Sequence, residues 1–73
     1  MFVVEVSTNL EGTTAQAVWK RDTLDEAFMH LHQIMASAMA NANVKNAFVT
    51  VLNQYGDTVK HEYWERVEEE TEG

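Results

Sequence analysis

The sequence predicts an α+β fold: a single small ββαββ domain with a four-stranded, mainly antiparallel sheet and one helix packed on one face. Two observations predict the strands, because "TNLEGT" and "LNQYGDT" each place an N-x-x-G turn between segments rich in β-branched and aromatic residues. A third predicts the helix, since apolar residues recur at helical spacing through residues 22–42. The length of 73 residues fits one domain, which we place at residues 1–67.

The N-terminal hairpin comes first. Residues 2–8 are rich in valine and predict a strand, residues 9–12 predict a turn, and residues 13–20 predict a second strand. An even-length loop centred between Leu10 and Glu11 is favoured, because it places the apolar side chains of both strands on one face. That face would contain Phe2, Val4, Val6, Ala15, Ala17 and Trp19.

The helix is predicted over residues 22–42. Thr23 and Glu26 have the S/T-x-x-E spacing of a capping box at its start. At its end, Asn41 and Asn43 are candidate left-handed caps and Lys45 complements the negative end of the helix dipole. The predicted core face consists of Leu24, Ala27, Phe28, Leu31, Ile34, Met35, Ala38, Met39 and Ala42.

The C-terminal hairpin combines strands at residues 44–53 and 58–67. A three-residue loop at residues 54–56 would pair Val51 with Val59. Continued along the hairpin, this register puts His61 and Tyr63 under the helix. It leaves three large apolar side chains on the opposite face, namely Phe48, Leu52 and Trp64.

Apolar groups on both faces of the sheet predict burial on both sides, since a sheet with one wet face alternates cleanly. The outward side of the helix is also short of charge after Glu26. It is either an alanine-rich solvent face with high helix propensity or a contact surface. The candidate interface residues are Phe48, Leu52 and Trp64 on the sheet, and Met29, Ala36 and Ala40 on the helix.

Composition excludes several classes of function. A net charge of −7 with only five Lys and Arg residues opposes direct binding to nucleic acid. There is no cysteine for a disulfide or a thiolate metal site, and no apolar run of the length that spans a membrane. The N-terminal residues lack the features of a signal peptide, so we expect a cytoplasmic protein. Residues 68–73 predict an acidic, disordered C-terminal tail.

Nothing in the sequence predicts catalysis. His30 and His32 are the only closely spaced histidines, and residues two apart on a helix point about 200° away from each other. They therefore cannot share a metal ion from a regular helix. Nucleophile, phosphate-loop and zinc-protease motifs are absent. We expect no catalytic residues, no metal and no cofactor.

The sequence favours a non-enzymatic interaction domain that self-associates as a homodimer, because a chain this short is marginally stable alone. The alternative is an acidic inhibitor or regulator that binds a basic nucleic-acid-binding surface on another protein. Its size and charge resemble those of accessory proteins of phages and mobile elements, an analogy of composition alone. A small-ligand-binding protein or an enzyme ranks last.

Overall fold

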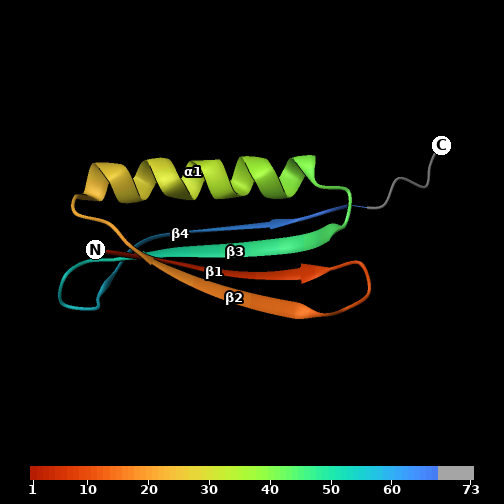
Figure 1. Ribbon diagram of the computed structural model, residues 1–73, viewed down its shortest axis with the longest axis horizontal. Coiled ribbons are helices and arrows are strands. Elements are labelled where there is room, and N and C mark those ends of the chain that lie inside the picture. Colours follow the sequence, from red (N-terminus) through yellow and green to blue (C-terminus); the bar gives the residue numbers. More distant parts are fainter. Residues whose placement is uncertain (68–73) are drawn as a thin grey trace.

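A computed structural model describes residues 1–67 and confirms the ββαββ order (Figure 1). The elements are β1 (Phe2–Asn9), β2 (Thr14–Lys20), α1 (Leu24–Ala40), β3 (Val44–Leu52) and β4 (Thr58–Glu65). The strands form one antiparallel sheet in the order β2-β1-β3-β4, so β2 and β4 are its edges. The predicted acidic tail lies outside the described residues. No helix in the described part of the chain is long and apolar enough to cross a membrane.

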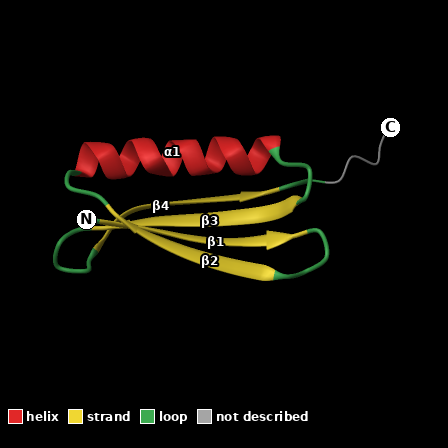
Figure 2. Ribbon diagram, viewed as in Figure 1, coloured by secondary structure: helices red, strands yellow, loops and turns green. Residues whose placement is uncertain are grey.

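The two faces of the sheet differ, because α1 lies along one of them and no described element covers the other (Figure 2). The core lies between α1 and the two central strands. Its fully buried large side chains are Leu31, Val3, Val49 and Val51, and the remaining core residues are Ala27, Ile34, Met35, Ala38 and Ala47. The predicted core face of the helix is therefore largely confirmed. It is wrong for Met39, which is 49% exposed, and for Ala42, which lies beyond the helix end and is exposed.

The helix begins as predicted at Thr23, whose Oγ1 accepts a hydrogen bond from the backbone N–H of Glu26 at 3.1 Å. The reciprocal bond is shifted by one residue, since the Glu26 carboxylate accepts from the N–H of Asp22 at 3.2 Å. At the other end Asn41 has φ −95° and ψ 110°, and Asn43 has no positive φ either, so the predicted left-handed cap is wrong at both positions.

Arg66, which follows β4, closes the helix end instead of Lys45. Its Nη2 donates to three carbonyl oxygens at the end of α1, those of Ala38, Met39 and Asn41, at 3.4, 3.2 and 2.9 Å. Its Nε donates to the Val44 carbonyl at 3.0 Å, and the guanidinium lies 4.9 Å from the centre of the Trp64 ring. One side chain thus adds a charged donor at the helix end, where the Ala38 and Asn41 carbonyls also accept from the backbone N–H groups of Asn41 and Val44.

The turns of both hairpins are closed by the same pattern of hydrogen bonds to an asparagine side chain. The Asn9 Oδ1 accepts hydrogen bonds from the backbone N–H groups of Glu11 and Thr13, at 3.0 and 2.9 Å. Gly12 completes the turn at φ 93°, a conformation that favours glycine. The second turn repeats this pattern with Asn53, Tyr55, Gly56 and Asp57.

The first loop therefore contains three residues, and the even-length prediction is wrong. The turn outweighs the hydrophobic pattern, because two hydrogen bonds to Asn9 and the positive φ of Gly12 fix the loop length. The resulting register pairs Val4 with Val18 and Val3 with Trp19. Consequently Phe2, Val4 and Val6 lie on the face away from α1, opposite to Ala15, Ala17 and Trp19.

The second loop has the predicted three residues, but a β-bulge follows it. Leu52 pairs with Thr58 and Val51 pairs with Lys60, so Val59 is an extra residue on β4 and the predicted pairing of Val51 with Val59 is wrong. The extra residue exchanges the two faces for the rest of the strand. Trp64 lies on the helix side and packs against the core, which corrects its predicted place on the outer face.

Candidate protein-interaction site

The face of the sheet opposite α1 carries a continuous group of apolar side chains. Side chains alternate between the faces of a strand, so the buried Val3 and Val49 identify the helix side and their neighbours identify the outer side. We call the apolar residues of the outer side the outer patch. It consists of Phe2, Val4, Val6, Val18, Phe48, Leu52 and Tyr63.

The centre of the outer patch is aromatic. The ring of Phe48 stacks on His61 at 5.8 Å between centroids, and the ring of Tyr63 lies 6.3 Å away from it. Val6 pairs with Phe48 on the neighbouring strand, which extends the apolar surface across the sheet. Phe48 is 39% exposed, Tyr63 55% and Val18 63%, so large apolar groups face outward on three strands.

In the described part of the chain, charged side chains on this face lie only at its corners. Lys20 pairs with Phe2 at one end of β2, and Glu65 pairs with Asn46 at the opposite end of β4. The two charges therefore occupy diagonally opposite corners. Among residues 1–67, the only titratable side chains between them on this face are His61 and Tyr63.

The predicted interface residues do not all lie on one surface of the protein. Phe48 and Leu52 lie on the outer face as expected, whereas Trp64 does not. On the exposed side of α1, Met29 is 61% exposed, and Ala36 and Ala40 are exposed as well. Val18 and Tyr63 were not among the predicted interface residues. The Asn9 turn is the sequence signal that places Val18 on the outer face, whereas no sequence signal marks the β4 bulge that places Tyr63 there.

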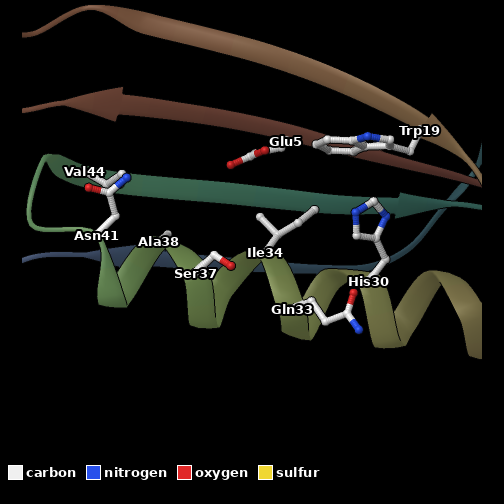
Figure 3. Close-up of a pocket in the computed structure, with 9 residues that line it drawn as sticks. All are labelled: Glu5, Trp19, His30, Gln33, Ile34, Ser37, Ala38, Asn41 and Val44. Carbon is white, nitrogen blue, oxygen red and sulfur yellow. The ribbon is translucent and has the colours of Figure 1, made fainter.

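A second surface is a groove between α1 and β2 (Figure 3). Its volume is about 340 Å³, and its lining residues are Glu5, Trp19, His30, Gln33, Ile34, Ser37, Ala38, Asn41 and Val44. Glu5 comes from the sheet floor, and no described residue forms an ion pair or a side-chain hydrogen bond with it. Burial raises the pKa of its carboxyl group above the ordinary value.

His30 stands at one end of this groove, where its ring meets the edge of Trp19 at 4.6 Å between centroids. Burial and the nearby Arg21 charge lower the pKa of His30. Its Nδ1 accepts a hydrogen bond from Arg21 Nε at 3.2 Å, so the lone pair of this nitrogen is already used. His32 is exposed, and residues 1–67 contain no group of three His, Asp or Glu side chains placed to hold a metal ion.

Replacing Glu5 with glutamine is expected to stabilise the protein at neutral pH by less than about 1 kcal/mol. The folded state raises the pKa of Glu5, so protonated Glu5 favours folding below its ordinary pKa and this contribution is lost as the pH rises through the folded value. The stability advantage of Glu5→Gln over wild type should therefore grow between about pH 4 and pH 7. Urea unfolding across this range measures it, and an advantage that is constant with pH would contradict the assignment.

No protein-family model matches the sequence, and comparisons with curated proteins and with solved structures find no match either. The outer patch and the groove are therefore interpreted from their own chemistry.

Proposed function

We propose that this protein is a non-enzymatic interaction domain that self-associates as a symmetric homodimer through the outer patch. The observation that supports this most directly is the exposure of Phe48, Val18 and Tyr63 on a face that no described element covers. Contiguous apolar surface bordered by polar residues is typical of protein–protein interfaces. A second copy is the simplest partner, because closed two-fold dimers are the commonest oligomers.

The corner charges favour a particular arrangement of the two copies. A two-fold axis in the plane of the interface that runs diagonally across the sheet, perpendicular to the line joining Lys20 and Glu65, brings Lys20 of one protomer near Glu65 of its partner. An axis parallel or perpendicular to the strands does not. A diagonal axis makes the strands of the two sheets cross at a steep angle, which is close to the orthogonal class of sheet packing.

The size of the face suggests a modest affinity. Four strands about 4.8 Å apart and seven residues at about 3.3 Å each give a footprint of roughly 450 Å² per protomer. Stable interfaces bury about 800 Å² of accessible surface on each partner. We therefore expect a dimer that dissociates in the micromolar range, and its oligomeric state is best followed over a range of concentrations.

Phe48→Glu is expected to abolish the dimer, because it places a charge in the centre of the outer patch. Sedimentation velocity from about 5 to 500 μM would show the wild type shifting from monomer to dimer and Phe48→Glu remaining a monomer. Met29→Glu is the matched control, since it adds the same charge to the exposed side of α1. A wild type that is monomeric throughout, or a dimer lost only in Met29→Glu, would contradict the proposal.

Exchanging the charges at Lys20 and Glu65 tests the proposed arrangement of the two copies. Lys20→Glu and Glu65→Lys should each weaken the dimer, and the double variant should recover much of the lost affinity, because the opposite charges again face each other. Additive weakening in the double variant would exclude the diagonal axis while leaving Phe48→Glu as the test of the face itself.

The second candidate function, an acidic regulator that binds a basic protein surface, is supported by the net charge of −7. Electrostatic association of this kind is fast and sensitive to salt. Capture of a defined basic partner that weakens steeply between low and physiological salt would favour it, and salt-independent capture would count against it.

A further inference from the structure

The edge strand β2 presents free backbone groups along its outer side. Arg21 N–H donates to the Met1 carbonyl at 2.8 Å and Asn9 N–H donates to the Thr13 carbonyl at 3.0 Å, so odd-numbered residues of this hairpin form its hydrogen bonds. The even-numbered residues of β2 therefore point their N–H and C=O groups away from β1. These are Thr14, Gln16, Val18 and Lys20.

The two edges of the sheet differ in their protection against a further strand. β4 has a bulge at Val59, and its charged side chains include Lys60, Glu62 and Glu65. β2 pairs regularly along its whole length and has one charge, Lys20, at its end. Charges and bulges are the usual features that prevent strand addition at an edge. The regular, nearly uncharged edge of β2 is open to it.

The groove beside α1 opens toward this edge. Ala15 and Ala17 are the β2 residues on the helix side next to Trp19, and their small side chains leave the space above the strand free. Glu5 pairs with Ala17 on the neighbouring strand, and its carboxylate lies within the groove (Figure 3). A side chain arriving over Ala17 would meet the carboxylate of Glu5 with the Trp19 ring beside it.

We propose that an extended segment of a partner protein adds to β2 as a fifth strand and places an arginine or lysine over Ala17, paired with Glu5. The backbone groups of Thr14, Gln16, Val18 and Lys20 bind the segment, and the groove selects its basic residue. The added strand would lie two strand spacings, about 10 Å, from the strand that carries Glu5. The side chains of arginine and glutamate together span this distance. A carboxylate beside an aromatic ring is the usual environment for a guanidinium or ammonium group.

Charge complementarity at Glu5 favours a segment of a partner protein at the β2 edge over a second copy of this chain. A β2 strand paired symmetrically on itself at Gln16, Ala17 or Val18 places Ala15, Ala17 or Trp19 of the second copy over Ala17, and none of these supplies a cation to Glu5. Its one basic side chain, Lys20, lies on the other face of the sheet. The groove lies on the face of the sheet opposite to the outer patch, and the proposal does not depend on self-association. Val18 is shared, since its backbone belongs to the β2 edge and its side chain to the outer patch.

A capped heptapeptide, Thr-Val-Thr-Arg-Thr-Val-Thr, is the probe for this site, with the same peptide carrying glutamine in place of arginine as its control. In an added strand, the central arginine and the two valines share one face. NMR titration of the ¹⁵N-labelled protein should shift the amide signals of β2 and the indole signal of Trp19. The arginine peptide should bind about tenfold more tightly than the glutamine peptide, the difference expected for one charge-assisted contact.

Two variants separate the parts of the proposal. Glu5→Gln should reduce the tenfold preference for arginine to about one, while both peptides still bind. Gln16→Pro removes an outward N–H and none of the bonds to β1, so it should weaken both peptides. The same spectra report whether each variant is folded.

Three results would overturn the proposal. They are the absence of β2 shifts at millimolar peptide, shifts confined to the outer patch, and a preference for arginine that persists in Glu5→Gln. Concentration-dependent changes at β2 without peptide, abolished in Gln16→Pro, would assign the edge to a second copy and would also overturn it. Because Phe48→Glu tests self-association independently, failure of one proposal leaves the other intact.

Discussion

Replacing Leu31 with alanine is expected to lower the free energy of unfolding by about 2–5 kcal/mol. Leu31 is completely buried at the centre of the contact between α1 and the sheet, in one cluster with Val3, Val49 and Val51. Its removal loses the transfer free energy of the side chain and leaves a cavity beneath the helix. A domain of this size has about 3–5 kcal/mol from its single core, so most of the variant should be unfolded.

Urea unfolding followed by circular dichroism measures this loss, with all samples at one protein concentration because dimerisation adds to apparent stability. Met29→Ala is the control, since Met29 lies on the same helix with its side chain 61% exposed, and its effect should stay within about 0.5 kcal/mol. A loss for Leu31→Ala that is no larger than that of the control would show that α1 does not pack on the sheet as described.

The second large effect is expected at Arg66, whose replacement with alanine should cost about 2–3 kcal/mol. The substitution removes four hydrogen bonds to main-chain carbonyls, a positive charge at the negative end of the helix dipole, and the contact with the Trp64 ring. Of the carbonyls left behind at the end of α1, those of Ala38 and Asn41 keep their backbone donors, whereas that of Met39 must find water instead. Hydrogen exchange should therefore accelerate first in the last turn of the helix.

Arg66→Lys separates charge from geometry. Lysine keeps the charge but lacks the planar fork that reaches several carbonyls at once, so it should recover less than half of the lost stability. Lys45→Ala is the control, because the sequence suggested Lys45 for this role and Arg66 fills it. If Arg66→Lys matched the wild type, the charge alone would account for the effect.

Local signals in the sequence were sufficient for the element order. The Asn-x-x-Gly turns, the Thr23 cap and the helical period each act over a few residues, and their consequences appear in the structure at the expected positions. Arg66 could not be predicted in this way. Its partners at the end of α1 are more than 20 positions earlier in the chain, and only the folded sheet brings them together.

The composition of the two sheet faces was harder to predict, because one residue of register exchanges them. For the first hairpin the deciding signal was present, since Asn9 and Gly12 specify a three-residue loop that the apolar pattern appeared to oppose. For the second hairpin there was none, because the bulge at Val59 has no glycine or other distinctive residue. As a result the predicted outer face is right for Phe48 and Leu52, which precede the bulge, and wrong for Trp64, which follows it.

The two asparagine turns also bear on how the chain folds. Each turn closes a hairpin whose strands are neighbours in sequence, and isolated hairpins form within about 1–10 μs. The sheet is completed only when β1 pairs with β3, which joins distant parts of the chain such as Val4 and Thr50. The chain contains no proline, so isomerisation adds no slow phase. We therefore expect docking of the two hairpins, with α1 closing over their junction, to set the folding rate.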